Sequence, residues 1–182
     1  MDVNKAIFSR RTIHFFENKK VSENIIRNSI EAANQAPCHR LTFPWRFYSV
    51  SLKKRMQILD LAIEIKSKKK QIDENTKNLI SAKYLNPSHF LITSQVLNKE
   101  LTIRKEDYAA CSCAIQNLSI SLASEGVFSK WSTGAITNNQ KTYKIADINP
   151  NKEEIIGFIW IGYGKNLPKI NRPLIDQIYK EI

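Results

Sequence analysis

Residues 105–126 read KEDYAACSCAIQNLSISLASEG and form the clearest regular pattern in this 182-residue chain. Apolar side chains recur along them at spacings of three and four, which is typical of a helix with one apolar face. That stripe consists of Tyr108, Cys111, Ile115, Leu118 and Leu122. Gly126 follows at the position where such a helix is expected to stop. We therefore predict a helix over residues 105–125.

A second informative stretch, residues 155–161, reads IIGFIWI. It is nearly all apolar but much shorter than the roughly 18 apolar residues that a membrane helix needs, so we predict a buried central strand. Aromatic and β-branched runs predict two further strands over residues 45–51 and 90–97. Helices or helical turns are predicted over residues 1–9, from an N-cap at Ser22 to a stop at Pro37, and over residues 138–146 and 174–179.

The remaining regions are less regular. In the opening helix, Val3, Ala6 and Ile7 are expected to face one side. Residues 53–82 are polar and Lys-rich with weak helical patterning, and we expect a mobile helical excursion there. No internal repeat or low-complexity linker divides the chain, so residues 1–182 are predicted to form a single α+β domain.

Composition sets limits on the class of protein. The 28 Lys and Arg residues against 17 Asp and Glu give a formal charge of +11, which fits either an affinity for phosphates and polyanions or a Lys-, Asn- and Ile-rich composition without function. No stretch is long and apolar enough to span a membrane, and Lys5, Arg10 and Arg11 interrupt any signal-peptide core. The three cysteines cannot form a closed disulfide framework. We expect a cytoplasmic protein in a reducing compartment.

The first group that could carry chemistry is Arg10-Arg11-Thr12 at the end of the opening helix. Two guanidinium groups and a hydroxyl suit an oxyanion, because arginine stays charged and presents a planar set of donors. The alternative is solvated charge, with arginine also favourable at the C-terminus of a helix.

The second group is residues 36–40, APCHR, where a helix stops at a proline and a cationic loop leads into a strand. Such loops often carry binding residues on a rigid scaffold. His39 could donate to a ligand oxygen, although an ordinary surface histidine is the commoner case. Cys38 could be a nucleophile if its neighbours lowered its pKa. No acidic or amide partner can be placed beside it, so we discount a cysteine hydrolase.

Two more groups lie in the second half of the chain. Residues 131–134, WSTG, offer hydroxyls, backbone amides and a flat apolar wall to a heterocycle, or else form a turn and an edge strand with a core tryptophan. Residues 162–165, GYGK, are followed by Lys169 and Arg172, and their glycines permit close backbone approach. Without the strand, loop and helix of a phosphate-binding loop, this is neither a P-loop nor a dinucleotide fingerprint.

Several other chemistries are excluded by spacing. Cys111 and Cys113 lie two apart on a helix and cannot share a metal, and the histidines have no metal-ligand spacing with them. No arrangement fits a Ser-His-Asp nucleophile elbow. The aromatic residues fall at core positions instead of alternating with Lys or Arg, which argues against a nucleic-acid stacking platform.

The order of these motifs resembles the nitroreductase family. The resemblance includes the opening helix with its Arg-Arg-Thr, the Ala-Pro loop and the Pro-Trp before a strand. It continues with residues 108–110, YAA, residues 114–118, AIQNL, Glu125-Gly126, Trp131 and the closing apolar strand up to Gly162. It covers essentially the whole chain and is greatest with the compact branch of about this size.

The resemblance implies an intertwined homodimer with a mixed central β-sheet flanked by helices and one FMN per subunit at the dimer interface. It implies a ping-pong transfer of hydride from NADH or NADPH to the flavin and then to a nitro group, a quinone or a related acceptor. Flavin N5 would carry the hydride, so no catalytic side chain is assigned. Neither a metal nor a membrane is implied.

It also implies roles at the phosphate end of FMN. Arg10 and Thr12 would bind the phosphate and ribityl oxygens, with Arg11 adjacent. A basic pair near the C-terminus would add to the phosphate grip, and Lys169 and Arg172 are the candidates. Serine is usual where this chain has Thr12, and the hydroxyl is kept.

At the ring end, Gln35 and His39 would meet the isoalloxazine or ribityl from the other subunit. Trp131, Ser132 and Thr133 would line the ring edge. The identity of the acceptor, the choice of NADH or NADPH, and the role of residues 53–82 stay open. Two alternatives to the enzyme are a non-catalytic descendant that keeps FMN and, less favoured, a basic nucleic-acid-binding protein.

Overall fold

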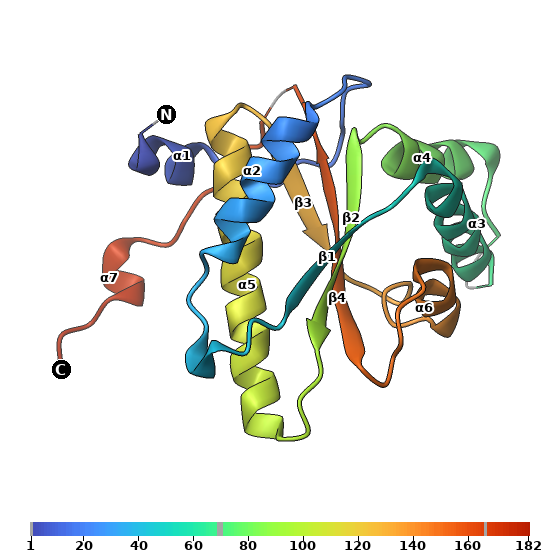
Figure 1. The fold of residues 1–182 in the computed structure, drawn as a ribbon. Coiled ribbons are helices and arrows are strands. Elements are labelled where there is room, and N and C mark those ends of the chain that lie inside the picture. Colours follow the sequence, from blue (N-terminus) through green and yellow to red (C-terminus); the bar gives the residue numbers. More distant parts are fainter. Residues whose placement is uncertain (1, 69–70, 166) are drawn as a thin grey trace.

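A four-stranded sheet lies between two groups of helices in the computed structural model, which describes residues 2–68, 71–165 and 167–182 (Figure 1). The strands run in the order β1-β2-β4-β3, and each neighbouring pair is antiparallel. Among the described residues, parallel pairing is limited to an isolated bridge between Thr12 and Ser129. The predicted α+β class with a helix-flanked central sheet is confirmed, and the four described strands form an antiparallel sheet with the parallel bridge outside them. The strands are β1 (Trp45–Ser49), β2 (His89–Val96), β3 (Phe128–Ser132) and β4 (Glu153–Gly162).

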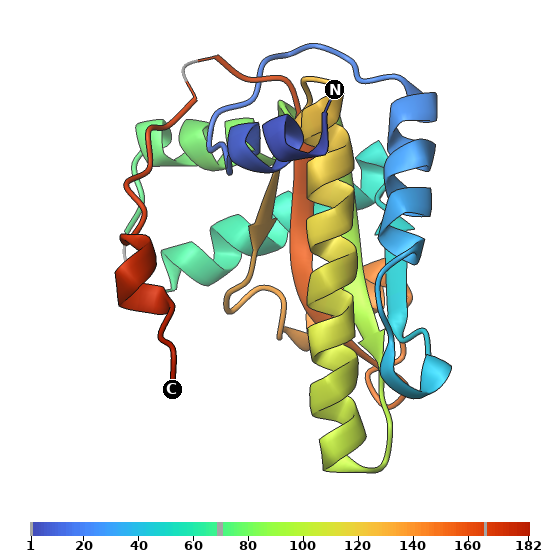
Figure 2. The same cartoon turned by 90° about the vertical axis from the view of Figure 1, so that its left-hand side faces the viewer.

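Helices cover both faces of the sheet. On one face lie α2 (Glu23–Asn34) and the long α5 (Leu101–Ser124), and α1 (Val3–Ser9) packs against α5 (Figure 2). On the other lie α3 (Leu52–Ser67), α4 (Glu74–Leu85) and α6 (Gln140–Ala146) (Figure 1). A short 3₁₀ turn, η1 (His39–Leu41), follows α2, and α7 (Ile175–Ile178) lies near the C-terminus.

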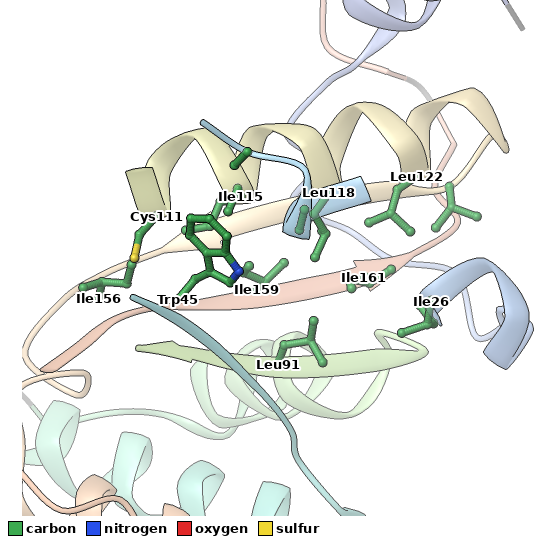
Figure 3. Close-up of a cluster of buried hydrophobic side chains, with 14 of the residues drawn as sticks. Ile26, Trp45, Leu91, Cys111, Ile115, Leu118, Leu122, Ile156, Ile159 and Ile161 are labelled. Carbon is green, nitrogen blue, oxygen red and sulfur yellow. The ribbon is translucent and has the colours of Figure 1, made fainter. Parts of the chain in front are cut away.

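The α5 face is held by the apolar stripe that the sequence predicted. Cys111, Ile115, Leu118 and Leu122 are all buried against the sheet, where Ile159 of β4 meets them (Figure 3). Tyr108 was predicted to join the stripe, and this is wrong, because its side chain is 44% exposed. The helix also begins four residues earlier than predicted and ends where Gly126 adopts a positive φ of 70°.

Strand β4 is buried on both faces, which explains its continuous apolar run. Its side chains alternate between the two cores until a bulge: Thr93 pairs with Gly157 but Ser94 pairs with Ile155, so Ile156 is the extra residue. On the α3 side, the Trp160 ring stacks on Phe90 with centroids 4.1 Å apart. The predicted central strand is therefore confirmed over a slightly longer range.

Residues 53–82, where only a helical excursion was predicted, contain most of two packed helices. Ser51 and Asp73 cap them, each accepting a backbone N–H three residues later. Their inner residues Ile58 and Tyr84 are almost fully buried. The helical part of the prediction is confirmed, while residues 69 and 70 of this Lys-rich segment lie outside the described residues.

Both ends of the chain expose apolar side chains. The predicted opening helix is confirmed, and of the three side chains expected to face one side of it, Ala6 is buried whereas Val3 and Ile7 are exposed. After residue 166, the C-terminal arm (residues 167–182) leaves the body of the molecule (Figures 1 and 2). Its apolar residues, α7 included, are exposed. None of the helices in the described part of the chain has the length and apolar character needed to cross a membrane.

Candidate functional site

A hollow of about 250 Å³ opens where β3, α5 and the segment after α1 meet. The segment contributes Arg10 and Thr12, and its backbone bridge to Ser129 fixes it against β3. Because side chains alternate along a strand, Ser129 and Trp131 both face α5 while Lys130 faces the other side. The α5 wall is a polar stripe at helical spacing, made by Ser112, Gln116 and Ser119 around Ile115.

Only some of these polar groups are free to bind a ligand. Ser112 and Ser119 donate to carbonyls one turn earlier in α5, and Ser129 donates to Ser119 at 3.0 Å. The side chains of Arg10, Thr12 and Gln116 make no hydrogen bond to any described residue. The hollow therefore presents a guanidinium, a hydroxyl and an amide over a floor of satisfied hydroxyls.

The hollow is strongly cationic at one end. Partial burial, together with the charges of Arg172 and Arg11, lowers the pKa of Arg10. No carboxylate among the described residues forms an ion pair with Arg10 or Arg172. Arg11 is engaged differently, because its Nη1 donates to the carbonyls of Phe8 at 2.6 Å and Arg10 at 2.9 Å. An anion would satisfy the like charges of Arg10 and Arg172.

The bulge in β4 positions the Trp131 side chain. Its indole N–H donates to the Ile156 carbonyl at 3.1 Å. A Cβ on Gly157 would lie 2.0 Å from that nitrogen, so only glycine leaves room for the indole. The Tyr108 ring lies beside it with centroids 6.5 Å apart. The space taken by the indole explains the glycine within an apolar strand.

A second cationic group lies on the opposite side of β3. Lys130 Nζ is 2.9 Å from His14 Nδ1, and the half-buried Lys83 of α4 lies over the Trp160 ring, 5.5 Å from its centroid. Lys130 first, then burial and Lys83, lower the pKa of His14. The pKa of Lys83 is lowered first by burial and then by the charges of Lys130 and Lys66. Burial also lowers the pKa of Lys130. We call His14, Lys83 and Lys130 the lysine cluster; none of the three forms an ion pair with a described acid.

The predicted residues of the Ala-Pro loop lie away from the hollow of this chain. Gln35 caps the C-terminus of α2 and is exposed. His39 is also exposed, with its Nε2 4.0 Å from a carboxylate oxygen of Glu106. Cys38 accepts a hydrogen bond from the Phe43 N–H at 3.2 Å and does not line the hollow. A role for Gln35 and His39 therefore needs a second subunit.

The structure separates the other predicted residues. Trp131 joins Arg10 and Thr12 in the hollow, whereas Ser132, half-buried, pairs with Phe158 in the sheet and Thr133 is exposed beyond the strand. Arg172 lies close enough to Arg10 for their charges to interact, while Lys169 is exposed on the C-terminal arm. The structure brings three of the predicted side chains together in the hollow, Arg10, Thr12 and Trp131, and the charge of Arg172 reaches Arg10.

The glycines of GYGK, residues 162–165, serve the fold. A Cβ on Gly164 would lie 2.6 Å from the Ile13 side chain and 3.1 Å from the Phe15 carbonyl. The Tyr163 carbonyl accepts a hydrogen bond from Glu17 at 2.9 Å. These glycines therefore let the backbone approach the segment after Thr12 of the same chain closely. The contact holds that segment in place.

Several residues of the site were not predicted. Ser112, Gln116 and Ser119 could have been found, since they form a polar stripe at spacings of four and three beside the apolar one. Lys83 and Lys130 had no such signal, because nothing in the sequence brings α4 to β3. Within the described residues, no cluster of His, Cys, Asp or Glu could hold a metal.

Comparisons with known proteins identify the family of the chain. The model of the nitroreductase family matches residues 7–163. The YfhC protein of Bacillus subtilis (strain 168), which carries the name of an NAD(P)H nitroreductase, is 30% identical over 176 residues, 94% of this chain and 90% of its own length. A nitroreductase-like family protein from Bacillus cereus has a TM-score of 0.85 at 21% identity, over 100% of this chain and 96% of its own. A nitroreductase with bound FMN from Bacteroides fragilis NCTC 9343 has a TM-score of 0.78 at 18% identity, over 100% of both chains. This chain belongs to the nitroreductase family.

Proposed function

We propose that this chain, as one domain over residues 1–182, is an FMN-dependent oxidoreductase that uses NADH or NADPH to reduce a nitroaromatic, a quinone or a related acceptor. The observation that carries the proposal is Arg10, which is half-buried, feels the charge of Arg172 and forms no ion pair with a described acid. A relative named as an NAD(P)H nitroreductase and a structural neighbour with bound FMN support the same reading.

The hollow fits the phosphate and sugar alcohol of FMN. A phosphate dianion would relieve the repulsion between Arg10 and Arg172 through charge-assisted hydrogen bonds. Thr12 and Gln116 offer a free hydroxyl and amide to the ribityl chain. Arg11 would contribute little directly, because it already bonds two carbonyls at the end of α1. Lys169 would act only if the C-terminal arm brought it to the phosphate.

The lysine cluster fits the ring. The hollow at Thr12 and the cluster at His14 lie on opposite sides of the edge strand β3 but only two residues apart in the chain, so a ligand that bends around this edge would reach both. When bound, FMN supplies the two-electron chemistry by taking a hydride from the nicotinamide and passing it to the acceptor. Lys83 and Lys130 would favour negative charge at the ring edge. Trp131, Ser132 and Thr133 would border the ring along β3.

The protein itself then needs no catalytic side chain. Its task is to hold donor and acceptor in turn against one exposed face of the ring, which gives ping-pong kinetics. The exposed apolar C-terminal arm and the exposed Val3, Ile7 and Phe8 of α1 support a homodimer, since such surfaces are usually covered. The dimer would bring Gln35 and His39 of the partner to the flavin.

The decisive experiment is a visible spectrum of the freshly purified protein, followed by anaerobic addition of NADH or NADPH. We expect flavin absorbance at about one FMN per chain and its bleaching by at least one nicotinamide. Flavin that neither nicotinamide bleaches would identify a non-catalytic FMN-binding descendant. A colourless protein that binds DNA or RNA in a salt-dependent way at physiological ionic strength would replace the proposal with the nucleic-acid reading.

A further inference from the structure

A second hollow, of about 240 Å³, lies between α3 and α4, and we call it the α3–α4 groove. Its walls are apolar and come from three parts of the chain. Ala62 and Ile65 belong to α3, Ile80 to α4, and Ala135 and Ile136 to the loop that follows β3. The groove therefore adjoins the segment WSTG at the end of β3, on the side of the sheet opposite the Arg10 hollow.

The polar groups of the groove are two cations and a hydroxyl. Lys66 and Lys83 line it, and neither forms an ion pair with a described acid. Glu64, the acid nearest to Lys66 in the sequence, is bonded to Lys68 and Lys141 instead. The groove thus combines apolar walls with uncompensated positive charge.

Tyr84 adds a donor. Its ring is buried, packs edge-on against Trp160 at 4.7 Å between centroids, and lines the groove. Its hydroxyl makes no hydrogen bond to a described residue. Burial raises the pKa of Tyr84, so the hydroxyl keeps its proton and can donate it to an anionic oxygen.

We propose that the α3–α4 groove binds small aromatic acids, with the ring against the apolar walls and the carboxylate at Lys66, Lys83 and Tyr84. The proposal rests on the proposed function, because it names aromatic acids that carry a reducible nitro or quinone group as the acceptor class of the same redox site. Lys83 is the link between the two, since it lines the groove and also belongs to the lysine cluster.

The size of the groove selects the ligand. A protein cavity of about 150 Å³ already accommodates benzene, so 240 Å³ suits one substituted ring and is too small for a whole flavin nucleotide. Neutral aromatic compounds could pack against the same apolar walls but would gain no attraction from the two lysines. The acidic group should therefore decide the affinity.

The test is calorimetric titration of the purified, flavin-loaded protein with 4-nitrobenzoate and with its neutral analogue 4-nitrobenzamide at low ionic strength. We expect the acid to bind roughly tenfold more tightly. Lys66→Gln should weaken binding of the acid roughly threefold and Lys66→Glu roughly tenfold, while binding of the amide stays unchanged. Tyr84→Phe, which keeps the ring, should also weaken binding of the acid. Lys68→Gln and Lys68→Glu, at the C-cap of the same helix, are the matched controls and should leave the binding of both ligands unchanged.

Equal affinity for the acid and the amide, or equal effects of the Lys66 and Lys68 variants, would overturn the proposal. So would a Lys66→Glu protein that loses flavin while its affinity for nitrobenzoate stays the same, because the groove would then belong to the flavin. Failure of the proposed function is seen separately in the absorbance spectrum. A colourless protein that still prefers the acid would keep the aromatic-acid site and lose the redox role.

Discussion

The two faces of the sheet are built in different ways. The α5 face is aliphatic and regular, with one long helix whose buried stripe fits against Ile159 and Ile161. The α3–α4 face is aromatic, with Phe90, Phe158 and Trp160 in mutual contact and two polar helices around them. Each face places cationic groups beside the same edge strand, β3.

This difference shows how one site is assembled from two kinds of packing. On the α5 face, the polar groups are positioned by a helix that periodicity alone defines. On the other face, Lys83 is held by cation–π contacts with Tyr84 and Trp160, whose centroids lie 5.6 and 5.5 Å from its Nζ. Strand β3 joins them, since Trp131 faces one side and Lys130 the other.

The largest effect on stability is expected at Gly157, where the packing of the α5 face leaves no space for a side chain. Gly157→Ala places a methyl group 2.0 Å from the Trp131 indole nitrogen and should lower the free energy of unfolding by about 3 kcal/mol. The measurement is denaturant unfolding followed by fluorescence. In a Trp131→Ala background the same substitution should cost almost nothing, and additive effects in this cycle would contradict the steric explanation.

Gly126→Ala is the matched control for Gly157→Ala. A Cβ there meets nothing within 4 Å, and only the positive φ of 70° opposes it. The expected loss is about 1 kcal/mol. A loss at Gly126 as large as that at Gly157 would contradict this order, in which the clash with Trp131 costs more than a positive φ.

The next effect concerns the anion site on the same face. Arg10→Ala removes a charge-assisted contact and should weaken FMN binding by about 2 kcal/mol, roughly thirtyfold in affinity. Flavin titration into the apoprotein measures it. Arg11→Ala is the neighbouring control, since Arg11 bonds carbonyls of α1, and should change the affinity less than about threefold. An unchanged flavin affinity in Arg10→Ala would refute the phosphate assignment.

The sequence predicts the α5 face of the sheet better than the α3–α4 face. The stripe from Cys111 to Leu122 and the strand around Ile159 were predictable, because each repeats one local period over many residues. Arg10, Thr12 and Trp131 were candidates from their own chemistry, and the resemblance of the motif order gave them their roles. Tyr108 and Ile7 fit the local pattern and are nevertheless exposed, since periodicity cannot tell which apolar face a second molecule would cover.

The other face could not be predicted in the same way. Helices α3 and α4 have weak periodicity because each touches the core with only a few residues, such as Ile58 and Tyr84. Lys83 and Lys130 are 47 positions apart and meet only through the tertiary fold. Strand β3 itself is short, and its alternation of Ser129 and Trp131 with Lys130 resembles that of an exposed edge strand.

A smaller effect should separate the lysine cluster from the Arg10 hollow. Lys83→Gln removes a cation next to the proposed ring and should shift the midpoint potential of bound FMN by about 30 mV or less, toward more negative values, because negative charge on the ring is then less stabilised. Spectroelectrochemistry measures the shift. Lys77→Gln on the same helix, where Lys77 pairs with Glu74, should leave the potential unchanged. An equal shift in both variants would indicate a general charge effect instead of a local one.

The smallest effect is expected at the surface tie that holds α3 to α6. Hydrogen bonds first from Lys141 and then from Lys68 lower the pKa of Glu64 from 4.5 to about 2. Because the folded-state pKa lies below the unfolded value, the stabilisation is present above about pH 4.5 and is lost as the pH falls toward 2. Glu64→Gln should therefore lower the melting temperature near neutral pH by less than about 4 °C, and the two proteins should converge in acid. Glu74→Gln, which breaks a pair within one helix, should have a still smaller effect. If the two variants behave alike at every pH, α6 is held by its apolar contacts alone, and the aromatic face needs no charged tie at its rim.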